Sequence, residues 1–302
     1  MMYKISDLLD LEHTIAAELF EGKTYAWEVL PEIKSFILKL GASLPEGEFD
    51  HPSEDVWIAK DAKVFPSAYI GGPCIIDHEA EVRHCAFIRG SAIVGKGCVV
   101  GNSVELKNVV LFDKVQTPHY NYVGDSVLGY RAHMGAGSIT SNVKSDKTLV
   151  VVKNGAERIE TGMKKFGAIL GDCVEVGCNS VLNPGSVIGR RASVYPTSSV
   201  RGQVPADYIY KSAGAIVRRS EIRNNLMIIK ERPNFDKIFP NDSFPNNIKV
   251  VVRDIDPNTN SISIRNLKSN SSSVIVHKVN QQKHSTLNFE ATRTASSSPQ
   301  RR

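Results

Sequence analysis

The feature that most constrains this chain is a large aliphatic residue at every sixth position from Ile58 to Leu106. The same spacing returns from Leu170 to Val200, and a small residue usually stands two positions before each aliphatic. Neither the 3.6-residue period of a helix nor the two-residue alternation of a strand gives this pattern. The period indicates a parallel β-helix of hexapeptide repeats, in which three hexads close one triangular coil. Its inward ladder comprises Ile58, Val64, Ile70, Ile76, Val82, Ile88, Val94, Val100, Leu106, Leu170, Val176, Leu182, Ile188, Val194 and Val200.

Glycine follows the inward position in several hexads. We expect these glycines at sharp corners, where the backbone needs conformations that a Cβ atom would restrict. The positions are Gly71, Gly95, Gly101, Gly129, Gly135, Gly171, Gly177 and Gly189.

The pattern divides the chain into three parts. Residues 1–50 are predicted to form a helical cap over the first coil, with helices at Ile5–Phe20 and roughly 27–40. Residues 51–220 form the β-helix domain, and a hairpin insertion at about 145–165 turns on Asn154-Gly155. Residues 221–302 read as a disordered tail. Within that tail, IKVVVRDI and SSVIVHKV are candidate short strands.

The ladder is irregular between Leu106 and Leu128, because this gap is not a multiple of six. Irregular segments inside a regular repeat tend to carry function. This one contains His119, Tyr120 and Tyr122.

Composition restricts the class of protein. The sequence contains no run of eighteen apolar residues, and its start, MMYKISDLLDLEH, mixes acids into its apolar positions, so we expect neither a membrane span nor a secretory signal. Cys74 and Cys98 fall on the small inward positions and indicate buried thiols in a reducing cytoplasm. Residues 221–302 hold thirteen Lys and Arg against seven Asp and Glu, without a regular interleaving of aromatic residues. We therefore expect no nucleic-acid partner.

Two motif strings carry a resemblance to a known family. AFIRGSAIVGKGCVVGNSVELKN begins at Ala86, HYNYVGDSVLGYRAHMGAGSITSN ends at Asn142, and a weaker match continues to about Arg219. These strings resemble the acetyltransferase half of the bifunctional glucosamine-1-phosphate acetyltransferase / N-acetylglucosamine-1-phosphate uridylyltransferase. The resemblance implies a left-handed β-helix trimer, with acetyl-CoA and an amino-sugar phosphate meeting between neighbouring subunits. The uridylyltransferase half has no counterpart in this sequence.

The resemblance also implies roles for single residues. His119 matches the general base, and a histidine can accept an amine proton near neutral pH. Arg89, Lys107 and Tyr122 match residues that hold the acceptor's phosphate and sugar, and charged donors suit a phosphate. The remaining acceptor positions are Asn142, Lys147 and His133, and the cofactor positions are Ala168, Cys178 and Pro196.

This sequence departs from the family pattern at several of these positions. His133 stands where an acceptor-binding Asn is usual, Cys178 replaces a Ser, and Pro196 stands where a small residue is expected. The loop that carries Lys147 is one residue shorter than usual, so its match to the family lysine is approximate.

The sequence is compatible with three functions. The first is an acetyl-CoA-dependent N-acetyltransferase, acting on glucosamine 1-phosphate in the synthesis of UDP-N-acetylglucosamine. The second is a non-catalytic β-helix scaffold or binding protein. The third is a zinc hydratase similar to the γ-carbonic anhydrases, for which His84 and His119 are suggestive. That class expects a third histidine where this chain has Gly124, and zinc catalysis needs three protein ligands.

Overall fold

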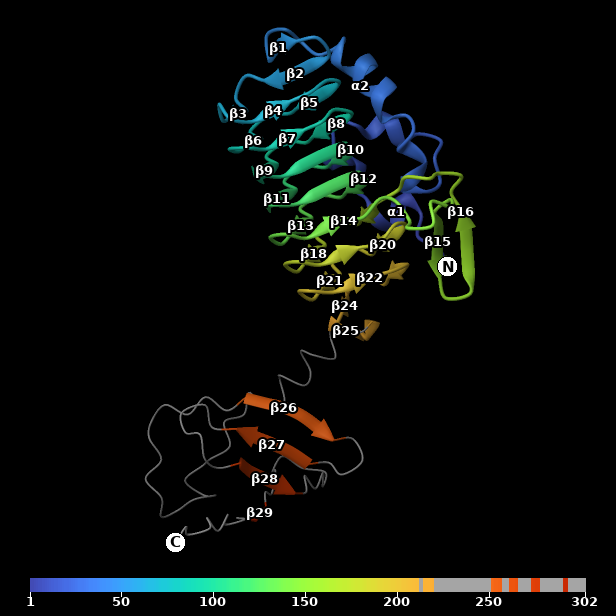
Figure 1. Cartoon of the computed structure of the whole chain (residues 1–302), viewed down its shortest axis with the longest axis vertical. Coiled ribbons are helices and arrows are strands. Elements are labelled where there is room, and N and C mark those ends of the chain that lie inside the picture. The colour runs from blue at the N-terminus through green and yellow to red at the C-terminus, as the bar shows by residue number, and fades with distance from the viewer. Residues whose placement is uncertain (212–213, 220–250, 257–260, 266–272, 278–289, 293–302) are drawn as a thin grey trace. The chain divides into compact units, whose positions relative to one another are not determined.

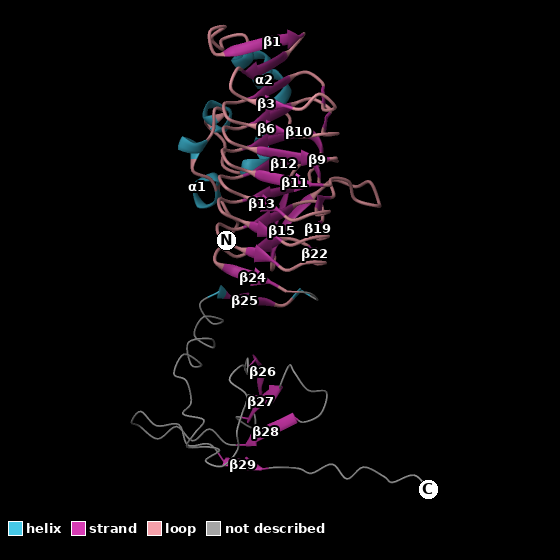
Figure 2. Ribbon diagram, turned by 90° about the vertical axis from the view of Figure 1, so that its left-hand side faces the viewer, coloured by secondary structure: helices cyan, strands magenta, loops and turns pink. Residues whose placement is uncertain are grey.

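The computed structural model describes residues 1–211, 214–219, 251–256, 261–265, 273–277 and 290–292. It divides into two compact units, residues 1–226 and 227–302. The first unit is a parallel β-helix whose strands stack rung upon rung (Figures 1 and 2), as the six-residue period predicts. Among the described residues, no helix is long and apolar enough to cross a membrane.

Three stacks of strands form the sides of the prism. The first stack, which we call the covered face, comprises β2 (Val56–Ala59), β5 (Cys74–Ile76), β8 (Ala92–Val94), the second halves of β10 (Glu105–Leu111) and β12 (Tyr122–Leu128), β17 (Ala168–Leu170), β20 (Ser186–Ile188) and β23 (Gln203–Val204). At its upper end β1 (Phe49–Ser53) pairs antiparallel with β2.

The second stack, which we call the aromatic face after its outward Tyr69, Phe87 and Tyr122, comprises β4 (Tyr69–Ile70), β7 (Phe87–Ile88), the first halves of β10 and β12, β14 (Ile139–Thr140), β19 (Val181–Leu182) and β22 (Ser199–Val200). The long strands β10 and β12 pass from this face around the corner to the covered face.

The third stack, which we call the polar face, comprises β3 (Lys63–Val64), β6 (Glu81–Val82), β9 (Val99–Asn102), β11 (Gln116–His119), β13 (His133–Met134), β18 (Glu175–Val176), β21 (Ser193–Val194) and β24 (Tyr208–Tyr210). The last described strand of this unit, β25 (Ile216–Arg218), pairs antiparallel with β24.

The inward ladder forms the core of the prism. From Ile76 onward its aliphatic side chains are buried, as predicted. Val64 is 36% exposed because it belongs to the first coil, where the interior opens at the end of the stack. Cys74 and Cys98 lie inside the prism as predicted, and burial raises the pKa of both thiols. The Cys98 thiol also donates to the carbonyl of Phe112.

The irregular segment consists of two shortened coils. Leu111 pairs with Val94 and with Leu128, seventeen residues away in each direction, whereas regular rungs such as Ile70 and Ile88 are eighteen apart. Each shortened coil therefore loses one residue, at the corner between the aromatic and covered faces. The ladder continues through this segment, because Thr117 and Thr140 fill two of its inward positions and are fully buried.

The predicted role of the glycines needs a correction. None of the eight has a positive φ; the corners are turned by residues such as Glu79, Cys85 and Ser91, with φ between 52° and 59°. The glycines are required for a different reason, which is the close approach of the neighbouring coil. A Cβ atom on Gly101 would lie 1.6 Å from the carbonyl oxygen of Pro118.

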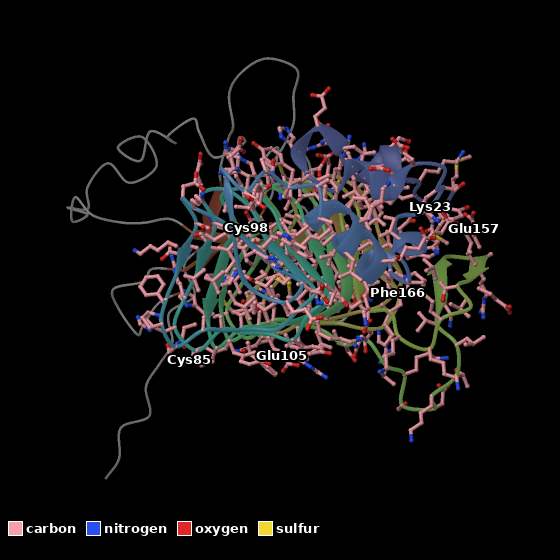
Figure 3. The ribbon with its side chains drawn as sticks, turned by 90° about the horizontal axis from the view of Figure 1, so that it is seen from above. Lys23, Cys85, Cys98, Glu105, Glu157 and Phe166 are labelled. Atoms are coloured by element: carbon pink, nitrogen blue, oxygen red, sulfur yellow. The ribbon has the colours of Figure 1, made fainter. Side chains whose placement is uncertain are left out.

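The N-terminal segment lies along the covered face and not over the first coil. Leu8 accepts a backbone hydrogen bond from Asp172, Leu30 accepts one from the Asn108 side chain, and the helix α2 (Ile33–Gly41) packs against β5, β8 and β10. Figure 3, a view from above, shows this segment on the side of the prism that Phe166 occupies, while Glu105 lies on another side.

This position explains a second set of aliphatic residues. On the covered face the residue before the inward position is also aliphatic and points outward, where the N-terminal segment buries it. Apolar side chains on the outside of a sheet need such a partner, because exposing them to water is unfavourable. The set comprises Ile75, Ile93, Val110, Val127, Ile169 and Val187.

The predicted helices of residues 1–41 are shorter than expected. The structure contains α1 (Ile5–Leu8), the 3₁₀ turns η1 (Leu11–His13), η2 (Ala17–Phe20) and η3 (Ala26–Val29), and α2. The first predicted helix ends early because the Asp10 side chain accepts from the Glu12 amide and Thr14 is extended. The second is interrupted at Pro31, which has no N–H to donate.

The hairpin and the second unit complete the described structure. Strands β15 (Val151–Asn154) and β16 (Glu157–Glu160) pair antiparallel, and the turn residues are Gly155 and Ala156, one position later than predicted. In the second unit β26 (Val251–Asp256), β27 (Ser261–Arg265), β28 (Ser273–His277) and β29 (Glu290–Thr292) form an antiparallel sheet. The two candidate strands lie at β26 and β28. Apart from these four strands, the tail predicted as disordered lies outside the described residues.

Candidate acceptor site on the aromatic face

A buried carboxylate, that of Asp125, organises the residues in the middle of the aromatic face. Lys107 Nζ donates to both of its oxygens, at 2.8 and 3.1 Å. Asn108 Nδ2 donates at 3.0 Å, and Asn142 Nδ2 also donates to it. Asp125 is only 3% exposed, and a buried carboxylate requires this number of donors. Lys107, on strand β10, and Asn142, two residues after β14, are thus held in fixed positions.

Arg89 occupies the rung above Lys107 and is paired differently. Its guanidinium donates to Glu105 Oε1 at 2.8 Å, and this contact raises the pKa of Arg89 above its ordinary value. The two side chains are 47% and 32% exposed. An ion pair in contact with water exchanges partners easily. Arg89 can therefore turn toward an anionic ligand, whereas Lys107 is held by Asp125.

Tyr122 stands one rung below Lys107 and meets Asn142 of the next rung. Asn142 Nδ2 lies 3.2 Å from the Tyr122 hydroxyl. Burial raises the pKa of Tyr122 above its ordinary value, and the carboxylates of Asp125 and Glu105 add to this effect. A phenol that stays neutral keeps its proton available for a hydrogen bond to a ligand.

His119 lies at the corner between the polar and aromatic faces. It ends β11, is exposed, and pairs in register with Asn102 of the coil above. Ala136, Cys178 and Pro196 occupy the same corner of the following coils, as the backbone hydrogen bonds from Gly137 to His119, Asn179 to Ala136 and Thr197 to Cys178 show. The predicted base therefore shares one edge of the prism with two of the three predicted cofactor residues.

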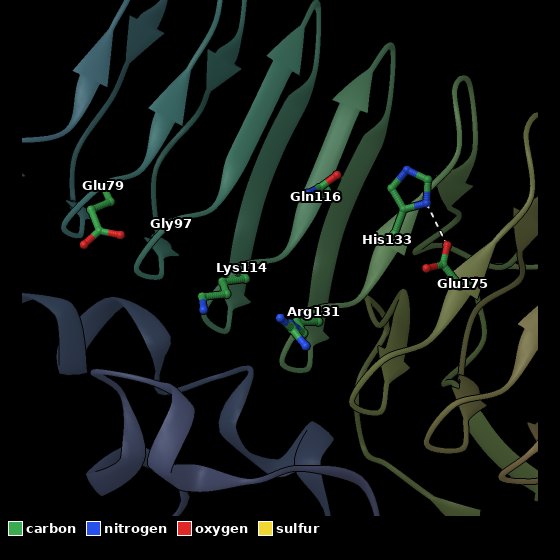
Figure 4. A pocket seen from close by; sticks show the side chains of 7 residues that line it. All are labelled: Glu79, Gly97, Lys114, Gln116, Arg131, His133 and Glu175. Atoms are coloured by element: carbon green, nitrogen blue, oxygen red, sulfur yellow. Dashed lines mark hydrogen bonds and ion pairs between the residues drawn. The ribbon is translucent and has the colours of Figure 1, made fainter.

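His133 lies away from this group, on the polar face. Its Nδ1 atom is 2.8 Å from Glu175 Oε2. Figure 4 shows both side chains at the edge of a cavity of about 790 Å³, which is also lined by Glu79, Gly97, Lys114, Gln116 and Arg131. Within one chain His133 does not join Tyr122 and Asn142.

Two other predicted residues also lie apart. Lys147 is exposed in the loop between β14 and β15, where its amide donates to the Lys144 carbonyl. Ala168 is fully buried in β17, and its amide donates to Ser126 Oγ at 3.0 Å. Its methyl group faces the interior of the prism and cannot contact a ligand outside it.

Sequence reasoning missed Glu105, Asn108 and Asp125. All three stand within the motif strings, so the signal was present, but the strings do not show which acid pairs with which base. That information comes from the stacking of the coils, because Lys107 and Asp125 are eighteen residues apart across a shortened coil. The acids matter for ligand binding, since they neutralise both cations of the site.

Comparisons with known proteins bear on the family. A family model described as the GMPPB C-terminal domain matches residues 70–208. A bifunctional sugar-1-phosphate nucleotidylyltransferase/acetyltransferase of Sulfurisphaera tokodaii is 34% identical over 156 residues, which is 52% of this chain and 39% of that protein. The bifunctional protein GlmU of Methanococcus maripaludis is 29% identical over 199 residues, or 65% of this chain and 48% of that protein. These matches confirm the resemblance of this chain to the bifunctional nucleotidylyltransferase/acetyltransferases.

The chain spans less than half the length of either of these relatives. Among solved structures, the acetyltransferase domain of PglB from Neisseria gonorrhoeae has a TM-score of 0.26 and 16% identity, and covers 60% of this chain and 62% of that one. A score this low carries no argument about the site.

Proposed function

We propose that the β-helix domain is an N-acetyltransferase that moves an acetyl group from acetyl-CoA to the amine of an amino-sugar phosphate. The observation that carries the proposal is the grouping on the aromatic face: Arg89, Lys107, Tyr122 and Asn142 occupy successive rungs, and His119 stands at the adjacent corner. Cations for a phosphate, neutral donors for a sugar and an exposed imidazole for an amine are the groups that such a transfer needs.

The chemistry assigns one proton transfer to His119. The neutral amine attacks the thioester carbonyl, a C–N bond forms, and the C–S bond breaks. His119 takes the proton that the nitrogen loses, and the departing thiolate of CoA takes up a proton as it leaves. Binding along the corner of Cys178 and Pro196 would bring the thioester to the edge on which His119 lies.

Glucosamine 1-phosphate is the acceptor we propose to test first. In one chain the cations of the site are balanced, because Arg89 pairs with Glu105 and Lys107 with Asp125. A phosphate must therefore displace Glu105 from Arg89 and use the N–H of Lys107 that Asp125 leaves free. Placing these groups side by side before binding lowers the cost of ordering them.

We also propose that the active assembly is a homotrimer with sites between chains. The covered face is occupied by the chain's own N-terminal segment, but the aromatic and polar faces remain available. His133 and Lys147, which lie apart from the site in one chain, would then reach it from a neighbour. Light scattering of the full chain should give the mass of three chains, and a monomer at micromolar concentration would contradict a shared site.

The test of the function is thiol release from acetyl-CoA in the presence of glucosamine 1-phosphate, with glucosamine as the control that lacks the phosphate. We expect turnover with both amines and a KM lower by about tenfold or more for the phosphate, because a charge-assisted contact is worth about 1.5–3 kcal/mol. Absence of acetyl transfer to any amino sugar would favour a non-catalytic scaffold. A zinc hydratase would need three protein ligands, and this chain has Gly124 where the third histidine is expected.

A further inference from the structure

Two exposed aromatic rings stand directly above the proposed acceptor site. Tyr69 is 61% exposed and Phe87 is 43% exposed, on adjacent rungs of the aromatic face. Their ring centroids are 5.5 Å apart and their planes are inclined at 59°. Single exposed aromatic residues need no explanation, but a pair next to a polar site presents a continuous apolar surface.

The register aligns this pair with the charged groups below it. Phe87 pairs with Glu105, and Glu105 pairs with Tyr122, so the outward side chains form one column. Arg89 follows Phe87 by two residues and therefore points to the same side of the sheet. Rungs are about 4.8 Å apart, which places Phe87 about 10 Å and Tyr69 about 14 Å from the rung of Tyr122.

From these positions we infer that the acceptor is linked to a nucleoside diphosphate, whose base stacks on Tyr69 and Phe87. The diphosphate then lies at Arg89 and Lys107, the amino sugar at Tyr122 and Asn142, and the amine beside His119. This inference rests on the proposed function for the identity of the sugar. It adds a binding subsite for the base that a sugar 1-phosphate would leave empty.

The order of groups along the column supports this assignment. A nucleoside diphosphate sugar presents an aromatic base, a ribose, two phosphates and a sugar in sequence. Down the face lie the two aromatic rings, then Arg89 on the rung of Phe87 and Lys107 on the next rung, and then the neutral donors. Every base has a π-face, so stacking tolerates different bases. Glu105 is the acid nearest the phosphate path, and its exposed pair with Arg89 can open when a phosphate binds.

Isothermal titration of the full chain tests the base subsite without requiring turnover. The probes are UDP and GDP, and pyrophosphate serves as the control that lacks a base. We expect at least one nucleoside diphosphate to bind about ten- to a hundredfold more tightly than pyrophosphate, the range for stacking one base on aromatic side chains. The double variant Tyr69→Ala/Phe87→Ala should remove that difference and leave pyrophosphate binding unchanged.

Three control variants separate stacking from damage. Tyr69→Phe and Phe87→Tyr keep both rings and should retain nucleotide affinity. Tyr195→Ala removes an aromatic ring that is 42% exposed just after strand β21 of the polar face, and should have no effect. If UDP and GDP bind no more tightly than pyrophosphate, or if the double variant changes the mass in light scattering, the pair does not serve a base and the inference is overturned.

Acetyl transfer to UDP-glucosamine and glucosamine 1-phosphate separates this inference from the function on which it rests. We expect UDP-glucosamine to have the lower KM, and the double variant to raise that KM about ten- to a hundredfold without changing the KM of glucosamine 1-phosphate. The inference is overturned, and the function stands, if glucosamine 1-phosphate is acetylated but the two acceptors have the same KM and the double variant changes neither value. Nucleotide binding through the pair without any acetyl transfer would remove the function and retain the subsite.

Discussion

The covered face and the aromatic face are built from the same repeat but carry different outward residues. On the covered face the outward positions hold Ile75, Ile93 and Val127, all fully buried by the N-terminal segment. On the aromatic face the corresponding positions hold Tyr69, Phe87, Glu105 and Tyr122, all accessible to a ligand. The inward ladder fixes the fold of both faces. The outward residues decide which face contributes stability and which face contributes chemistry.

The largest expected effect is at the corner beside the aromatic face. His119→Ala should lower kcat by about 10²- to 10⁴-fold, the usual contribution of a positioned general base, and should leave the melting temperature nearly unchanged. His84→Ala is the matched control, because His84 lies at the same corner two coils above. Steady-state kinetics of both variants would detect the difference; a near wild-type kcat for His119→Ala would remove this residue from the mechanism.

On the covered face the expected effect is on stability. Ile93→Ala should lower the free energy of unfolding by about 2–5 kcal/mol, because it leaves a cavity under α2, and should leave KM for both substrates unchanged. Ile139→Ala removes an outward isoleucine of the aromatic face that is only partly buried, and should cost less. Urea denaturation of the two variants compares the faces directly. Equal losses would contradict the division between them.

The two cations of the site should differ from each other. Arg89→Ala and Lys107→Ala should each raise KM for the phosphorylated acceptor about ten- to a hundredfold, with little change for acetyl-CoA. Only Lys107→Ala should also lower stability, by about 1–3 kcal/mol, because it leaves the buried Asp125 carboxylate without its cation. Kinetics and thermal denaturation of the same preparations test both parts. If Arg89→Ala and Lys107→Ala lowered stability equally, the difference in exposure between the two ion pairs would not affect stability.

The smallest effect concerns Tyr122. Because burial and the neighbouring acids raise its pKa, the native state holds this proton more strongly than the unfolded chain does. Stability should therefore fall as pH rises from the ordinary tyrosine pKa, near 10, through the higher native value. The difference in absorbance titration between the wild type and Tyr122→Phe should show a midpoint above about 10. Glu105→Gln should lower that midpoint, and a midpoint at or below the ordinary tyrosine value would contradict the described environment.

Much of the fold could be predicted from the sequence, because the inward ladder has a strict period. Two inward positions were not predicted, because Thr117 and Thr140 occupy them and a search for periodic aliphatic residues passes over hydroxyl side chains. The covered face could also have been predicted, because once per coil a second aliphatic residue stands directly before the inward one. The six-residue period of the inward residues does not by itself reveal this second set. The short N-terminal turns could not be foreseen from apolar spacing, which does not show that Asp10 caps a turn.

The candidate site could be predicted in part. The motif strings identified Arg89, Lys107, Tyr122 and Asn142, which the structure brings to one face, and His119, which it places at the adjacent corner. The pairing of Lys107 with Asp125 depends on the length of a shortened coil, and single positions in a sequence do not reveal it. His133 illustrates the limit of a positional match, because in this chain it lies on the polar face beside Glu175.

Hydrogen exchange of the full chain with and without glucosamine 1-phosphate and CoA tests most directly whether the aromatic face is the binding site. We predict slower exchange for peptides that cover residues 105–108, 119–125 and 139–142, with no change across residues 1–41 on the covered face. Slower exchange confined to residues 1–41 or to the cavity around Lys114 and Arg131, or no change anywhere at saturating ligand, would contradict the account.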